Sequence, residues 1–134
     1  MEEKFKYQGE KFFLEWDEEN KILAINMGGS HNKEDAEDFG VGLKDFFGKK
    51  EKLSLLKILI DARKLEKSDH EARRLYAGIA KEAAKKMKGK VALCSANVFV
   101  RMVGNFVVMA ASGDIEMKIF SGPDEGLKWL KKDN

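Results

Sequence analysis

The segment Leu55–Cys94, LLKILIDARKLEKSDHEARRLYAGIAKEAAKKMKGKVALC, decides the fold class of this chain. It begins with a short strand, predicted over Leu55–Asp61 and rich in Ile and Leu, and it ends with a second apolar strand over Val91–Cys94. Between the strands, apolar residues recur every three or four positions, which predicts an amphipathic helix that stops near Gly89. A strand, a helix and a second strand in this order favour parallel pairing through a right-handed crossover.

The start of that helix has a signature of its own, Ser68-Asp69-His70-Glu71. We predict a capping box here, in which the Ser68 hydroxyl accepts a hydrogen bond from the Glu71 amide. The Glu71 carboxylate in turn accepts one from the Ser68 amide. The helix is therefore expected to begin directly after Ser68.

The N-terminal part of the chain predicts a β-hairpin and a helix. Phe12–Asp17 and Ile22–Met27 alternate apolar residues with others, and a polar turn separates them. Gly28-Gly29-Ser30 is expected to be a turn that ends the second strand. A helix follows over about Asn32–Phe47, with Asn32 as its N-cap.

The C-terminal part continues the alternation. Asn97–Ser112 is predicted to be a helix, Glu116–Phe120 a strand, and Pro123 suits the first position of a last helix. The whole pattern predicts an α/β fold, with a mixed, mostly parallel sheet of about five strands and four helices mainly on one side. Several strands keep a polar face, which is why we expect one-sided cover. Residues 1–134 are expected to form a single domain.

The segment Asn97–Ser112, NVFVRMVGNFVVMAAS, is apolar on almost every side of its predicted helix. A helix of this kind is buried, or it is covered by a partner, a second subunit or an apolar ligand. Full burial is difficult to arrange in a domain this small. The sequence therefore favours a contact surface on this helix.

The predicted contact surface consists of Val100, Arg101, Gly104, Asn105 and Val108. Arg101 and Asn105 lie one helical turn apart on the polar stripe, and Gly104 between them would let another backbone approach closely. One interpretation is a contact with an anion or with the backbone of a partner. The alternative is structural: Arg101 would pair with a carboxylate at the sheet edge, and Asn105 would satisfy the backbone of a nearby loop.

The composition excludes several classes of protein. Lys plus Arg number 25 and Asp plus Glu 23, so a net charge of +2 gives no indication of nucleic-acid binding. The single cysteine excludes an internal disulfide and fits a reducing cytoplasm. The N-terminus lacks the apolar core of a signal peptide, and no apolar run approaches the ~18 residues of a transmembrane segment. We therefore expect a cytoplasmic protein without a transmembrane segment.

The sequence shows little sign of catalytic or metal chemistry. Cys94 follows a strand and precedes a helix, a position that can hold a nucleophile. An enzyme that depends on Cys94 is therefore a third functional hypothesis, besides the two given below. Because no small-residue elbow flanks Cys94, a buried small hydrophobe is the better interpretation. His31 and His70 are far apart in the chain, and no His, Cys, Asp and Glu cluster has metal spacing. We expect no catalytic residue, no metal and no cofactor.

Three blocks of sequence suggest a family. Arg101-Met-Val-Gly104-Asn105-Phe106, then Lys118-Ile-Phe120, then Gly126-Leu-Lys-Trp129-Leu130, resemble small bacterial stand-alone STAS proteins of the SpoIIAA-like kind, which are related to anti-sigma-factor antagonists. The resemblance covers nearly the whole chain. It implies a mixed sheet with helices along it, and a binding or regulatory module without chemistry of its own.

The resemblance also bears on regulation. In phosphorylation-regulated anti-sigma antagonists, a Ser or Thr at the start of the second helix, in an Asp-Ser-Ser-Gly-like segment, receives a phosphate from a partner kinase. The equivalent regulatory loop here is Ser68, Asp69, His70 and Glu71. Asp69 matches the family Asp, but His70 and Glu71 occupy the serine positions, so the phosphoacceptor is missing. Glu71 as a permanent phosphate mimic and modification of Ser68 both stay open as alternatives.

Two functional hypotheses of different classes follow. The first is a non-catalytic regulatory or protein-interaction module that binds a protein partner or itself, with a homodimer expected. The second is an apolar-ligand or lipid-binding domain, since STAS-like folds are compared with lipid-carrying CRAL-TRIO domains. The second has less support, because 134 residues leave little room for a core and a large pocket together.

Overall fold

The computed structural model describes residues 5–49, 55–86, 88–95 and 115–132. The elements in chain order are β1 (Lys6–Gln8), β2 (Phe12–Asp17), β3 (Ile22–His31), α1 (Lys33–Lys49), β4 (Leu56–Ser68), α2 (His70–Lys86), β5 (Gly89–Ser95), β6 (Ile115–Phe120) and α4 (Pro123–Lys131).

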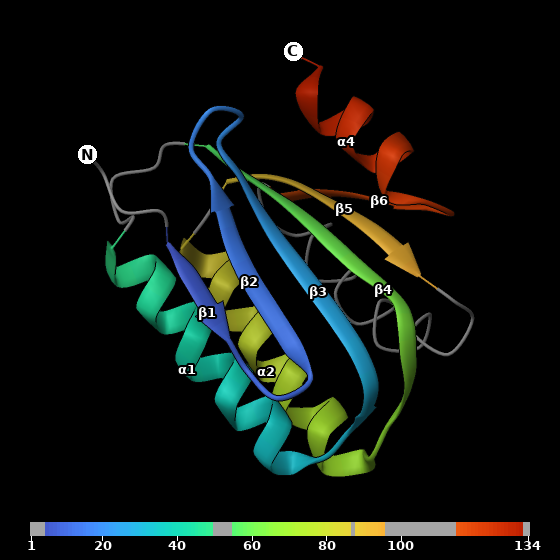
Figure 1. Cartoon of the computed structure of the whole chain (residues 1–134). Coiled ribbons are helices and arrows are strands. Elements are labelled where there is room, and N and C mark those ends of the chain that lie inside the picture. The colour runs from blue at the N-terminus through green and yellow to red at the C-terminus, as the bar shows by residue number, and fades with distance from the viewer. Residues whose placement is uncertain (1–4, 50–54, 87, 96–114, 133–134) are drawn as a thin grey trace.

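The strands form one mixed sheet in the order β1-β2-β3-β4-β5-β6 (Figure 1). The first two pairings are antiparallel, and the pairings β3–β4, β4–β5 and β5–β6 are parallel. This confirms the predicted mixed, mostly parallel sheet, with six described strands in place of about five. The additional strand is β1, which at three residues is too short to show an alternating pattern.

Helices α1 and α2 cover one face of the sheet, and α4 lies on the other (Figure 1). Trp16, Phe46 and Val91 belong to the large core under α1 and α2, and each is almost completely buried. Leu130 of α4 packs against alternate residues of the sheet, among them Leu59. Two of the three described helices thus lie on one side, as predicted; the predicted helix Asn97–Ser112 lies outside the described residues.

The unit that decided the fold class is present as β4, α2 and β5, with β4 and β5 parallel. However, β4 continues to Ser68, well beyond its predicted end at Asp61. Its inward-facing residues Ala62, Leu65 and Ser68 are spaced by three, because the register against β3 shifts twice. Bulges of this kind remove the period of two that identifies a strand in a sequence.

The prediction that Gly28-Gly29-Ser30 ends the second strand was wrong. These residues lie inside β3, which continues to His31. Gly29 has φ +74°, in the left-handed region that glycine adopts readily, and it lies at one of the two register shifts. The glycines therefore carry an irregular strand forward rather than stop it.

None of the described helices combines the length and the apolar character needed to cross a bilayer.

Candidate functional site

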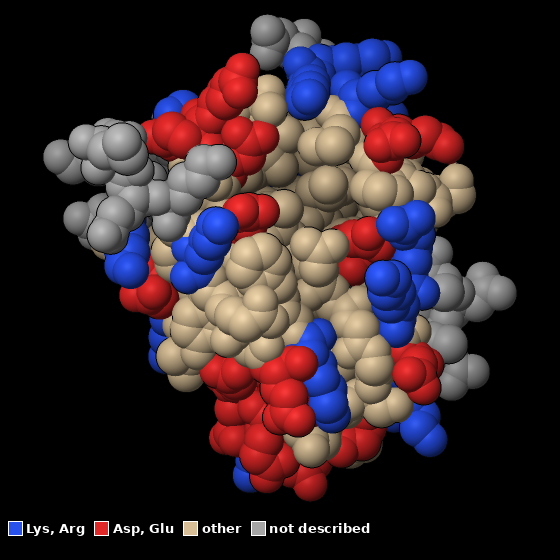
Figure 2. Space-filling view, viewed as in Figure 1, with Lys and Arg blue, Asp and Glu red and all other residues tan. Residues whose placement is uncertain are grey.

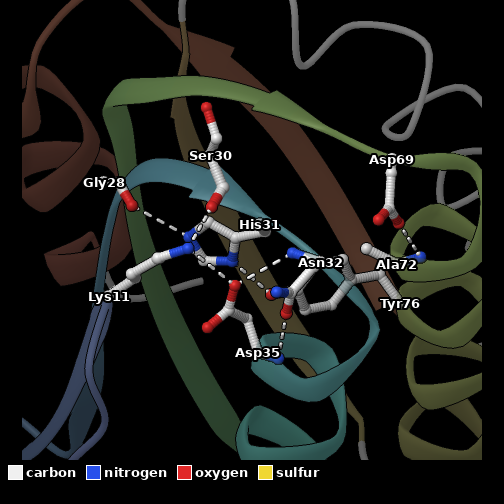
Figure 3. Close-up of polar contacts among 9 residues, drawn as sticks. All are labelled: Lys11, Gly28, Ser30, His31, Asn32, Asp35, Asp69, Ala72 and Tyr76. Atoms are coloured by element: carbon white, nitrogen blue, oxygen red, sulfur yellow. Dashed lines mark hydrogen bonds and ion pairs between the residues drawn. The ribbon is translucent and has the colours of Figure 1, made fainter.

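The carboxyl ends of β3 and β4 meet the first turns of α1 and α2, and this junction is our candidate functional site (Figure 3). His31 and Ser68 are paired at the ends of the two parallel strands. The Asp69 amide donates a hydrogen bond to the His31 carbonyl oxygen over 3.0 Å. The predicted regulatory loop, Ser68–Glu71, is thereby fixed beside the start of α1, at the edge where α/β sheets commonly bind ligands.

The start of α1 is held by a reciprocal capping box. Asn32 Oδ1 accepts from the Asp35 amide and Asp35 Oδ2 accepts from the Asn32 amide, both over 2.9 Å. The predicted N-cap role of Asn32 is confirmed. The box follows the S/T-x-x-E pattern with Asn and Asp in the two positions.

Lys11, which directly precedes β2, ties this capping box to the sheet. Its Nζ donates to the Ser30 carbonyl oxygen over 2.6 Å and to Asp35 Oδ2 over 3.0 Å. Burial alone would raise the pKa of Asp35, but the Asn32 amide and the Lys11 ammonium outweigh it and lower that pKa. Asp35 is therefore a charged, almost buried carboxylate.

The start of α2 is capped by Asp69, whose Oδ1 accepts from the Ala72 amide over 2.8 Å. The predicted capping box between Ser68 and Glu71 was therefore wrong. Ser68 is the last residue of β4, and α2 begins at His70. The unrecognised extension of β4 moves the N-cap position along the chain by one residue.

His31 and Tyr76 form the buried centre of the junction. His31 Nδ1 lies 2.5 Å from Tyr76 Oη, and His31 Nε2 lies 2.9 Å from the Gly28 carbonyl oxygen. A carbonyl can only accept, so Nε2 carries a proton, and in the neutral imidazole Nδ1 accepts from the Tyr76 hydroxyl. Burial lowers the pKa of His31 and raises the pKa of Tyr76, which keeps both side chains neutral.

We predict that His31 makes stability depend on pH below its ordinary pKa of 6.5. The folded pKa is lower than the unfolded one, so the unfolded chain binds more protons as the pH falls below 6.5. The free energy of unfolding should therefore decrease from pH 6.5 toward the folded pKa, by at most about 1.4 kcal/mol per pH unit. Urea titrations between pH 5 and 8 would measure this slope.

The variant His31→Gln should flatten this slope, even if it also lowers stability at every pH. His70→Gln is the matched control, because the exposed His70 ring stays in water in both states. An unchanged slope in His31→Gln would contradict the assignment.

The four residues of the predicted regulatory loop are not equally accessible. Asp69, His70 and Glu71 are exposed, whereas Ser68 is 8% exposed. Arg73 Nη1 donates a hydrogen bond to the Ser68 carbonyl oxygen over 2.9 Å, which holds the backbone in place at the end of β4. The junction therefore presents a charged first helical turn on a rigid base.

The predicted contact surface lies outside the described residues. It consists of Val100, Arg101, Gly104, Asn105 and Val108.

Cys94 is completely buried on the α4 face, and burial raises the pKa of its thiol, which confirms that its side chain packs as a small hydrophobe. Within the described ranges, no group of three or more His, Cys, Asp or Glu side chains could hold a metal ion.

Sequence reasoning missed three members of the junction, Lys11, Asp35 and Tyr76. Asp35 could have been found, because it follows Asn32 by three residues at a predicted helix start. Lys11 and Tyr76 come from distant parts of the chain, and only the folded sheet brings them to His31 and Asp35.

The order and pairing of the elements match a SpoIIAA-like fold. The chain is similar to an uncharacterised protein of the DUF3478 family with a SpoIIAA-like fold from Shewanella loihica, with a TM-score of 0.64 and 20% identity over 96% of this chain and 92% of that chain. It is also similar to an anti-sigma factor antagonist from Mycobacterium paratuberculosis, with a TM-score of 0.50 and 10% identity over 97% and 94% of the two chains.

The family follows from the sequence itself. The chain belongs to the DUF7793 family, a domain of unknown function that matches residues 49–134. No curated protein matches the chain.

Proposed function

We propose that this protein is a non-catalytic, cytoplasmic regulatory or protein-interaction module, comparable to anti-sigma-factor antagonists, and that residues 1–134 act as one domain. Its contact surface comprises the α2 start with Asp69, His70 and Glu71, and the predicted helical surface of Val100, Arg101, Gly104, Asn105 and Val108. Its partner is a protein, a second copy of the chain included.

The observation that carries the proposal is the exposed first turn of α2 on an immobilised base. The Asp69 amide is bonded to the His31 carbonyl oxygen, and the Asp69 side chain caps the helix. A contact surface that is already ordered loses little conformational entropy when a partner binds.

The charge at this end of the molecule indicates what kind of partner fits. Acidic side chains gather where α1 and α2 begin (Figure 2). They include Glu34 and Glu71, which lie in the first turns of these helices. A partner with a basic surface would associate faster through electrostatic complementarity.

A kinase switch is not part of the proposal. Ser68 is the only serine of the regulatory loop, and its burial at the end of β4 keeps it from a kinase in the folded protein. His70 and Glu71 occupy the two exposed positions in which related antagonists carry serines. We therefore propose regulation by binding alone.

We predict that Val108→Asp and Val100→Asp each weaken self-association at least about tenfold, because a charge in an apolar contact is desolvated without a partner. Size-exclusion chromatography with light scattering over a range of concentrations would measure this. Val41→Asp is the matched control, since Val41 is a 57% exposed valine on α1 and its variant should associate like the wild type.

A strict monomer whose stability is unchanged in Val100→Asp and Val108→Asp would contradict the assignment of this surface. Native mass spectrometry of the same samples separates the alternative function, because a co-purified lipid would favour the apolar-ligand domain.

A further inference from the structure

The outer edge of β6 has the features of a pairing edge. β6 is the last strand in the sheet order, and no other strand in the described part of the chain pairs with its second edge. An edge strand presents a row of backbone N–H and C=O groups that can pair with another chain. Ile119 on this strand is 50% exposed, one of the few large apolar side chains among the described residues that are so accessible.

The sequence of β6 is complementary to itself in the antiparallel direction. It reads Ile-Glu-Met-Lys-Ile over residues 115–119, so the two charges flank Met117 symmetrically. When two copies pair antiparallel about an axis through Met117, Glu116 of each copy lies opposite Lys118 of the other. Ile115 of each copy then lies opposite Ile119 of the other, and the two copies of Met117 lie opposite each other.

Only this register matches the charges. A twofold axis perpendicular to the sheet keeps each side chain on its own face, so neighbouring registers differ by two residues in their pairing. A centre at Glu116 places the two glutamates opposite each other, and a centre at Lys118 does the same for the lysines. Like charges directly opposite are destabilising, whereas opposite charges stabilise a strand pair.

The surroundings of β6 agree with this arrangement. Lys118 Nζ lies 5.5 Å from the centre of the Trp129 ring of α4, which holds the ammonium on the α4 face of the sheet. Ile115 and Met117 belong to the core on the opposite face, and Ile119 follows them as the exposed member of that row. Pairing would bring Ile119 next to Ile115 of the second copy and cover it.

We propose that two copies of this chain pair antiparallel through their β6 edges, centred on Met117, and so join their sheets into one. This inference rests on the self-association in the proposed function and adds the β6 edge to the surfaces that mediate it. The dimer is isologous, because the same edge of both copies forms the contact.

The test is a charge-reversal series on the two facing residues. Glu116→Lys and Lys118→Glu each turn both cross-strand pairs into like charges and should weaken the dimer about tenfold. The double variant E116K/K118E restores opposite charges and should associate like the wild type. An equimolar mixture of the two single variants should form a heterodimer, since one chain then carries two lysines and the other two glutamates.

Light scattering for the single and double variants, and native mass spectrometry for the mixture, give the readouts. Lys118→Gln is the control for the lost contact with Trp129, and it should weaken the dimer less than Lys118→Glu. If the dimer persists in both single variants, or if the double variant fails to recover it while folded, the β6 contact is overturned.

The outcomes also separate this inference from the proposed function. A dimer that Val108→Asp abolishes and the β6 variants leave intact overturns the β6 edge and supports the helical surface. A dimer that responds only to the β6 charges supports the β6 edge and overturns the helical surface. A wild-type monomer at every concentration overturns both forms of self-association.

Discussion

Gly89→Ala should lower the free energy of unfolding by about 3 kcal/mol or more, a large part of the roughly 5–15 kcal/mol that stabilises a native protein. Gly89 opens β5 with φ +156°, and a Cβ on it would lie 1.7 Å from the Leu56 carbonyl oxygen. The Leu56 carbonyl oxygen is backbone in a paired strand and the backbone of residue 89 fixes the place of the Cβ, so no side-chain rotation can relieve the overlap. Urea unfolding followed by circular dichroism would measure the loss.

Gly78→Ala is the matched control for this prediction. Gly78 lies inside α2, where an added Cβ meets no atom of the described residues within 4 Å apart from its own helical turn. Alanine in a helix interior is favoured over glycine by about 1 kcal/mol, so the same substitution should here be neutral or stabilising. Equal effects of the two substitutions would contradict the close approach of β4 and β5 at Gly89.

Gly89 also shows what the sequence could predict of the fold. It was predicted as the stop of the second helix, and α2 does end near it, at Lys86, because helix stops are local signals. Gly89 itself is the first residue of β5. The contact with Leu56 depends on the parallel pairing of two strands separated by a whole helix. No local sequence pattern predicts how closely two strands so far apart in the chain approach each other.

The difference between local signals and long-range strand pairing also explains the wrong predictions around the candidate site. Regular alternation predicted β2 at its observed ends, Phe12–Asp17. It failed for β4 and for Gly28-Gly29-Ser30, where register shifts between β3 and β4 interrupt the period of two. The cap of α2 was consequently placed at Ser68 instead of Asp69, since its position depends on where β4 ends.

The second large effect is expected for Asp35→Ala, which should lower the free energy of unfolding by about 2 kcal/mol. The Asp35 carboxylate is 10% exposed and accepts hydrogen bonds from the Asn32 amide and from Lys11. Its removal leaves the Asn32 amide and the Lys11 ammonium without this acceptor, whereas Asn32 Oδ1 still accepts from the backbone amide of residue 35. The 31% exposure of Lys11 lets water replace part of the lost interaction, which limits the effect.

Two further measurements make the prediction for Asp35 specific. Because the folded pKa of this carboxyl lies below its ordinary value, its contribution is present above pH 3.8 and is lost as the pH falls through the folded pKa. Asp35→Ala should therefore flatten the acid limb of the stability curve. Asp45→Ala on the same helix removes an exposed ion pair with Lys49 at 3.4 Å and should change stability by less than about 0.5 kcal/mol. If both variants lower the free energy of unfolding equally, the start of α1 does not depend on the Asp35 capping box.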